Sequence, residues 1–464
     1  MLANRHVSID KCHAPEVSIG AFVFVYYKCL KVNFYFVIID NKMAEELLSR
    51  CLAQSLDILE LHFKHISVNG LRSIASHCGP SLRILKTEVD DKKSLAALQS
   101  VCKSCANLII LDLEGFYPEK FSEDLVLTAV QYCPLIQRLP TLHLDLSDLA
   151  MSVLASLYTL TELKLRRYSN SSSEAIQRIL QSNPSISCIS LEGDYIEDAL
   201  ITCIGRSCSN LKRLRFIQDT YIYNTAGVDN IFANTLSDSA LFELFSSCTH
   251  LEEFTLHQAS VFTVASLRAM FLYCEKLTTL ELRINSPTPA SSEPFLEGPY
   301  PSLTKVTLEF DGVAAQDLFT YCINMREVKL RHMLQLTDEA IKPFLYNCIN
   351  LDTFTLDSCG DMTIDGMNYI ASHCPHLRVL TLAVMPINEN VLIQLSLYCP
   401  KLTSLSIHSC HQEGPFTEAG VLALVERCTN LTALTIGGPS LRPFTRTLEL
   451  MKQGQLYTHI KFNI

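Results

Sequence analysis

The residue groups that most resemble reactive centres in this chain contain cysteine and histidine. Cys102 and Cys105 form a C-x-x-C pair, and His408, Cys410 and His411 make a second local cluster. A structural zinc site needs a second ligand pair at suitable spacing, and none accompanies either group. The chain also has no nucleophile elbow, phosphate-binding loop or H-E-x-x-H motif. We therefore predict no metal, no cofactor and no catalytic residue, and a protein that is not an enzyme.

A basic cluster suggests the binding of anions instead. Lys164, Arg166 and Arg167 belong to one stretch of the chain, and Arg213 and Arg215 to another. If both stretches are strands of one sheet with a single strand between them, the two groups lie roughly 10 Å apart on one face. Guanidinium groups match the geometry of phosphate, so this cluster is suited to an acidic or phosphorylated segment. A solvated charged stretch is the alternative interpretation.

A sequence repeat positions these residues. A cysteine, two residues and the pattern L-x-x-L-x-L recur in order as Cys348-INLDTFTL, Cys374-PHLRVLTL, Cys399-PKLTSLSI and Cys428-TNLTALTI. A period in the twenties with this pattern is typical of leucine-rich repeats. The same register extends back to Leu56 and gives 15 candidate repeats. Cys105 and Cys410 are repeat positions, which favours a structural role for both.

Three places depart from the repeat. The step from Leu211 to Leu251 is 40 residues, which predicts a loop insertion near 219–233. Pro140 falls inside a predicted strand, where its missing N–H interrupts the hydrogen-bond ladder. The proline-dense stretch 286–301 replaces a helix. It contains two minimal proline-directed phosphorylation motifs, and an exposed loop is the alternative.

Each repeat predicts a strand followed by a helix. The L-x-L core alternates inward and outward, as a strand does. Segments 337–348, 363–374, 417–428 and 67–78 begin with Thr or Ser, whose hydroxyl can cap the first helical turn. Stacked units bury a continuous core, so we expect an α/β, right-handed leucine-rich-repeat solenoid, or horseshoe. Parallel strands would line its concave side and helices its convex side, in one domain over residues 43–464.

Residues 1–42 join no repeat. The stretch 20–40 is apolar and aromatic, and we expect it to cap the first repeat. A membrane span is an alternative, but Lys28 and Lys31 near its middle would each cost a few kcal/mol there. A start of translation at Met43 is a further alternative.

Composition indicates the class of protein and its compartment. The chain is 48% hydrophobic, carries a net charge of −10 and contains 19 cysteines. It has no broad basic field, so we expect no nucleic-acid partner. The repeated cysteines behave as small buried hydrophobes, a whole repeat apart, unlike the local disulfide framework of a small secreted domain. We predict a cytoplasmic or nuclear protein without a membrane partner.

From Cys51 onward, the cysteine-ended repeats resemble the cysteine-containing leucine-rich repeats of F-box proteins and antagonist-of-mitotic-exit-type proteins. That resemblance implies a horseshoe that captures a protein substrate. It also implies an F-box that docks on a Skp-type adaptor within a cullin–RING ubiquitin ligase of the SCF type. This chain departs from the family, because the L-P-x-E-[IL] opening of an F-box is absent before Cys51 and the chain contains no Trp. A free-standing repeat regulator and a small-GTPase-activating repeat protein are the alternatives.

The exposed strand positions form the predicted binding surface. The third, fifth and seventh positions of L-x-x-L-x-L point outward when the fourth and sixth point into the core. These positions carry hydroxyls and interspersed charges, which suit a protein or peptide partner. The alternative is simple strand preference, since Thr is common on strands. The candidate partner-binding residues are Lys164, Arg166, Arg213, Arg215, His257, Glu281, Arg283, Lys329, Arg331, Thr355, Asp357 and His408.

Overall fold

The structure is a computed structural model that forms two compact units, Met1–Leu211 and Lys212–Ile464. It describes residues 29–34, 58–66, 68–88, 94–114, 119–140, 142–143, 146–168, 173–193, 196–218, 236–258, 263–284, 296, 298–309, 319–408, 418–436 and 461–463. The predicted insertion at 219–233, both phosphorylation motifs, Met43, Cys51, Cys410 and His411 lie outside the described residues. The single-domain interpretation stays a prediction.

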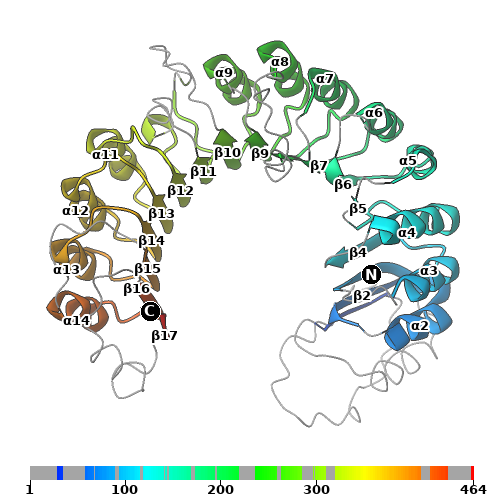
Figure 1. The fold of residues 1–464 in the computed structure, drawn as a ribbon, viewed down its shortest axis with the longest axis horizontal. Coiled ribbons are helices and arrows are strands. Elements are labelled where there is room, and N and C mark those ends of the chain that lie inside the picture. The colour runs from blue at the N-terminus through cyan, green and yellow to red at the C-terminus, as the bar shows by residue number, and fades with distance from the viewer. Residues whose placement is uncertain are drawn as a thin grey trace, which may run out of the picture. The chain divides into compact units, whose positions relative to one another are not determined.

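The first unit contains parallel strands in chain order (Figure 1). Strands β1 (Cys29–Phe34), β2 (Ile58–His65), β3 (Leu82–Glu88) and β4 (Ile110–Glu114) pair with one another. From the segment 1–42 the structure describes only β1, and its parallel pairing with β2 is compatible with the predicted cap. Strands β5 (Leu142–His143), β6 (Glu162–Tyr168) and β7 (Cys188–Gly193) continue the unit.

The expected interruption at Pro140 is present between β4 and β5. Arg138 forms an isolated parallel bridge with Ile110, whereas β5 begins only at Leu142 and pairs with β6. A proline has no N–H to donate, so the ladder on this strand stops on either side of it.

The second unit contains a longer parallel ladder of ten described strands in chain order. Its members are β8 (Arg213–Gln218), β9 (Glu253–Gln258), β10 (Thr279–Ile284), β11 (Lys305–Glu309), β12 (Glu327–Arg331), β13 (Thr353–Asp357), β14 (Val379–Ala383), β15 (Ser404–His408), β16 (Ala433–Ile436) and β17 (Lys461–Asn463). Pairing is in register from β9 to β17, without a shift.

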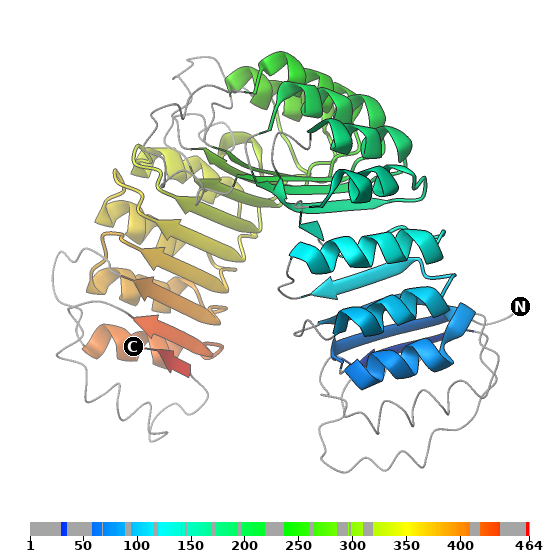
Figure 2. The same ribbon diagram turned by 45° about the vertical axis from the view of Figure 1, so that its right-hand side comes forward.

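Helices cover one side of the strands in each unit (Figures 1 and 2). The first unit has α2 (Val68–His77), the 3-10 helix η2 (Gly79–Ser81), α3 (Ser94–Ser104), α4 (Glu119–Tyr132), α5 (Asp148–Ala155), α6 (Ser173–Ser182) and α7 (Asp198–Ser207). The second has α8 (Asp238–Ser247), α9 (Val264–Tyr273), α11 (Asp338–Asn347), α12 (Ile364–His373), α13 (Glu389–Tyr398) and α14 (Glu418–Arg427). The alternation of strand and helix around a buried aliphatic core confirms the leucine-rich-repeat solenoid fold.

The predicted helix starts are confirmed where the structure describes them. Thr337 accepts a hydrogen bond from the backbone N–H of Ala340 at 3.3 Å, and Thr363 accepts one from Asp365 at 3.1 Å. The capping residues also link successive repeats. Asp338 accepts from the backbone N–H of Thr363 at 3.0 Å and from its hydroxyl at 2.6 Å. An acidic residue at the start of one helix therefore orders the start of the next helix.

The repeated cysteines form a ladder of thiol-to-carbonyl contacts. The Cys348 thiol donates to the carbonyl of Cys322 with an Sγ–O distance of 3.1 Å. Cys399 donates in the same way to Cys374 at 3.4 Å, and Cys428 to Cys399 at 3.6 Å. Each contact joins the end of one helix to the end of the preceding helix. The cysteines thus stabilise the stacking of repeats, and the repeat cysteines that the structure describes, from Cys78 to Cys428, are buried.

Tyrosine, asparagine and leucine take the cysteine position in irregular repeats. In the repeat after α9, the buried Tyr300 donates its hydroxyl to the carbonyl of Cys274. After α6 the position is Asn183, which is fully buried. Its amide nitrogen donates to the Ile179 carbonyl and its oxygen accepts from the Leu160 N–H, both at 2.9 Å. Leu157, three residues before Leu160, holds this position in another repeat and is also buried. The position therefore selects a buried side chain, which in most repeats can also donate to a carbonyl.

Candidate protein-binding surface

The exposed side chains of the second unit form three rows across the strands. The first row contains Arg213, Glu253, Thr279, Lys305, Glu327, Thr353, Val379 and Ser404. The middle row contains Arg215, Thr255, Glu281, Thr307, Lys329, Thr355, Thr381 and Ser406. The last row contains Ile217, His257, Arg283, Glu309, Arg331, Asp357, Ala383 and His408. The side chains between the rows are buried apolar residues such as Leu280 and Leu282, so the predicted alternation is confirmed.

One charge network crosses β9, β10 and β11. Glu281 accepts from His257 Nε2 at 2.8 Å and from Arg283 Nη2 at 3.0 Å. Arg283 also reaches Glu309, with an Nε–Oε2 distance of 3.4 Å. The hydrogen bond from His257, aided by Arg283 and opposed by burial, lowers the pKa of Glu281 to about 2. Glu281 is therefore ionised at neutral pH, and three predicted site residues, His257, Glu281 and Arg283, act as one group.

A second network lies on β11 and β12. Lys329 and Lys305 both contact Glu327, with Nζ–carboxylate distances of 2.7 and 3.1 Å. The hydrogen bond from Lys329, supported by Lys305 and opposed by burial, lowers the pKa of Glu327. Two ammonium groups share one carboxylate, so this part of the surface retains an excess positive charge.

Arg331 is flanked by two carboxylates and forms an ion pair with neither. The register places it between Glu309 and Asp357 in the last row. However, its guanidinium makes no hydrogen bond or ion pair with another described residue. Its Nε atom, like that of Arg283, is buried without a hydrogen-bond partner among those residues, but Arg283 Nε has Glu309 at 3.4 Å as an ion-pair partner. Asp357 instead accepts from the hydroxyl of Ser358 at 3.0 Å. Sequence alone had grouped Arg331 with the other exposed charges.

The surface changes character at β13. From there to β15 the first and middle rows carry Thr and Ser with one Val, and the only charged group among these described row residues is Asp357. Thr355 keeps 8% of its surface exposed, because its short side chain lies between neighbours in the middle row. His408 is exposed and its Nε2 lies 2.6 Å from the Ser406 hydroxyl. A charged zone over β8–β12 thus adjoins a hydroxyl zone over β13–β15.

The predicted basic cluster belongs to both units. In the first unit, Lys164 contacts Glu162 at 2.8 Å and Arg166 contacts Glu192 at 3.3 Å. In the second unit, Arg213 and Arg215 are exposed on β8. The joint anion clamp stays a prediction, and its first-unit half is already paired with carboxylates.

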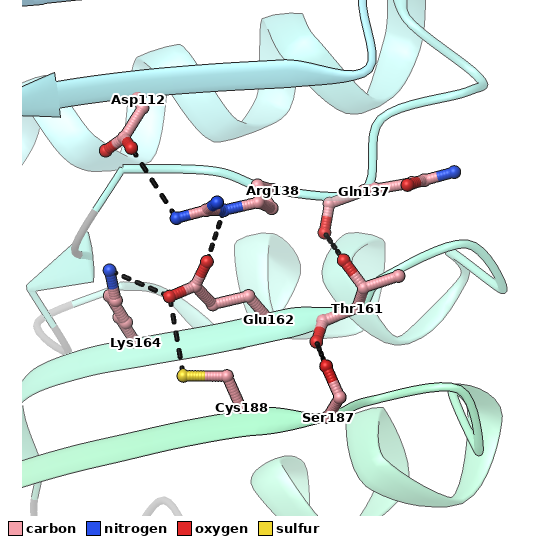
Figure 3. A network of polar contacts seen from close by, with 8 residues as sticks. All are labelled: Asp112, Gln137, Arg138, Thr161, Glu162, Lys164, Ser187 and Cys188. Atoms are coloured by element: carbon pink, nitrogen blue, oxygen red, sulfur yellow. Dashed lines mark hydrogen bonds and ion pairs between the residues drawn. The ribbon is translucent and has the colours of Figure 1, made fainter. Parts of the chain in front are cut away.

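Glu162 is the centre of a network that sequence reasoning missed (Figure 3). Its carboxylate is 5% exposed and contacts Arg138, Lys164 and the thiol of Cys188, the last at 3.4 Å. Arg138 also contacts Asp112 at 3.5 Å. Burial alone would raise the pKa of Glu162, but Lys164, Arg138 and Cys188 together hold that pKa below its ordinary value. No sequence signal marks this network, since its members come from separate repeats.

The groups that first suggested reactive chemistry have structural environments. Cys102 and Cys105 are buried, and burial raises the pKa of Cys105 to about 12. Such a thiol is a poor nucleophile and metal ligand at neutral pH. Within the described part of the chain, no group of His, Cys, Asp and Glu is placed to hold a metal ion. No helix among the same described residues is both long and apolar enough to cross a bilayer.

The fold and this surface define a cysteine-containing leucine-rich-repeat protein with a polar strand face. No protein-family model matches the chain. It is 23% identical to "Putative RNA-binding protein EEED8.10" of Caenorhabditis elegans over 269 residues, which cover 56% of this chain and 30% of that protein. It is 22% identical to "F-box protein MAX2" of Arabidopsis thaliana over 185 residues, which cover 39% of this chain and 24% of that protein. The chain therefore spans less than a third of the length of either relative.

Two solved structures show a more distant likeness. The yeast Rad7 and Elc1 complex contains a chain that is 17% identical, with a TM-score of 0.42 and coverage of 82% of this chain and 86% of that chain. The TLR13–ssRNA13 complex gives 15% identity and a TM-score of 0.38, with coverage of 88% and 52%.

Proposed function

We propose that this protein is a protein-interaction scaffold that recognises substrates for an SCF-type, cullin–RING ubiquitin ligase. The observation that carries the binding role is the strand face of the second unit. Its exposed rows cross successive strands in unbroken register. The weak homology to an F-box protein supports the ligase context.

The strand face suits a protein partner for a physical reason. The two networks centred on Glu281 and Glu327 already hold charged side chains in defined positions. A partner that matches them loses little side-chain entropy on binding and gains specificity from complementary charge. The neighbouring hydroxyls can donate or accept hydrogen bonds, so they can adapt to a peptide backbone.

RNA is the second partner to consider, because the C. elegans relative carries RNA binding in its name. Binding to a phosphate backbone relies on Lys and Arg that neutralise several phosphates. On the strand face of the second unit, Glu281, Glu309 and Glu327 lie among the bases and form ion pairs with them. This interleaving of acidic and basic side chains disfavours a polyanion such as RNA.

Affinity purification of the tagged full-length chain from its own cells, with mass spectrometry, tests the ligase role. We expect a Skp-type adaptor and a cullin to be recovered together with a substrate. As a control, a strand-face variant such as Glu327→Gln with Lys329→Gln should release the substrate and retain the adaptor. A stable partner without adaptor or cullin would reject the ligase role and favour a free-standing regulator.

A further inference from the structure

We propose that Arg331 anchors a carboxylate side chain of an acidic, extended protein segment bound across β11–β13. This inference rests on the proposed function only in that the strand face of the second unit binds protein. It adds the chemical class of the bound segment and the residue that selects it.

The unsatisfied guanidinium is the first observation. Arg331 Nε is buried and has no hydrogen-bond partner among the described residues. Buried polar atoms in folded proteins almost always have a partner, and an unpartnered one is costly. An acceptor supplied by a bound molecule would remove that cost, which makes this position responsive to a ligand.

The carboxylates on either side are engaged elsewhere. Glu309 contacts Arg283 at 3.4 Å, and Asp357 accepts from Ser358 at 3.0 Å. Lys329 lies two residues before Arg331 on the same strand face and shares Glu327 with Lys305. Arg331 is therefore available to an incoming acceptor, and the Lys305–Glu327–Lys329 group next to it carries one net positive charge.

The surroundings select a carboxylate over a phosphate. A guanidinium binds either group through two parallel hydrogen bonds. However, Glu309 and Asp357 occupy the same row on both neighbouring strands, about 4.8 Å away on each side. A phosphate monoester carries about two negative charges at neutral pH and is repelled more strongly than a carboxylate with one.

An extended segment can continue from this anchor onto the hydroxyl zone. Thr353, Thr381 and Ser404 are partly exposed there and can exchange hydrogen bonds with a peptide backbone. The small side chains of these rows leave room for a chain to lie close to the sheet. Arg331 would then select an acidic side chain of the segment. The hydroxyl zone would bind the segment's backbone and would tolerate different side chains.

Peptide selection on the full-length protein tests the anchor. A library of short random peptides is displayed, selected on the wild-type chain and sequenced. We expect enrichment of Asp and Glu at one position. The best peptide should lose about tenfold or more in affinity when that acid becomes Asn or Gln, and when the protein carries Arg331→Gln.

Arg326→Gln is the matched control, because Arg326 is an exposed arginine of the same repeat that precedes the strand. Its affinity for the peptide should stay within about twofold of wild type. If the Arg331→Gln protein folds poorly, the loss of affinity of the Asn or Gln peptide for the wild-type protein still tests the anchor. Replacement of the acid by phosphoserine should weaken binding.

Three results would overturn the anchor: no enriched acid, or no peptide at all; equal binding by Arg331→Gln; and tighter binding of the phosphorylated peptide. These results are separable from the ligase question. If the purification recovers an adaptor and a cullin but the peptide selection enriches no acid, only the anchor is rejected. If the selection enriches an acid that depends on Arg331 but the purification recovers no adaptor, only the ligase role is rejected.

Discussion

Val384 should show a reversal of the usual order of stability between alanine and glycine. His332, Ser358 and Val384 follow the last residue of three successive strands and have φ angles of 51°, 54° and 52°. The N–H of each donates to the carbonyl of the last residue on the next strand, at 2.8, 2.9 and 2.9 Å. The left-handed conformation is thus imposed by the ladder, and a β-branched valine is poorly suited to it.

The magnitude follows from comparing two truncations at this position. Val384→Ala and Val384→Gly both remove the isopropyl group, so the loss of packing largely cancels between them. A left-handed conformation costs a residue with a Cβ roughly 1–2 kcal/mol, which glycine avoids. Glycine in turn destabilises by roughly 0.5–1 kcal/mol relative to alanine through chain entropy. Val384→Gly should therefore be about 0.5–1 kcal/mol more stable than Val384→Ala.

Urea unfolding followed by circular dichroism measures the difference on the full chain. The matched control is Val379, on strand β14 of the same repeat, which is not among the described residues with positive φ. There the order should be normal, with alanine about 0.5–1 kcal/mol more stable than glycine. If Val384→Ala were as stable as Val384→Gly, the strain at this turn would be absent and the reasoning refuted.

Two further predictions concern the links between repeats. In Gly366→Ala the new Cβ would lie 2.0 Å from Asp338 Oδ1, so the carboxylate that bonds Thr363 must move; we expect a loss of about 1–2 kcal/mol in urea unfolding. Gly420→Ala is its control, since the nearest atom there is 3.1 Å away on the Glu389 side chain, and a smaller change is expected. For Glu281, a folded-state pKa of about 2 against an ordinary value of 4.5 means that its stabilisation is present above about pH 4.5 and is lost as pH falls toward 2. Glu281→Gln should flatten the dependence of unfolding free energy on pH in that window, and an unchanged slope would contradict the assignment.

The repeat pattern predicted the elements because their signals are local. Apolar spacing, a capping Thr such as Thr337 or Thr363, and the missing N–H of Pro140 each act within a few residues. The buried, structural character of Cys105 also followed from its place in the repeat. The thiol-to-carbonyl ladder did not follow, because its acceptor lies one repeat away. Nor did the exchange of cysteine for Tyr300 or Asn183, since a phenol, an amide and a thiol share only the ability to donate to a carbonyl.

For the binding surface, too, local features could be predicted from the sequence, whereas contacts between repeats could not. The sequence by itself determined which side chains face outward, because strand alternation depends only on neighbouring residues. It could not determine which charges pair, because Lys164 with Glu162 and Arg283 with Glu309 depend on register and side-chain reach. Only the tertiary structure decided that Glu309 is engaged by Arg283 and Asp357 by Ser358. Those two contacts leave the guanidinium of Arg331 without a partner among the described residues, although both acids flank it in register.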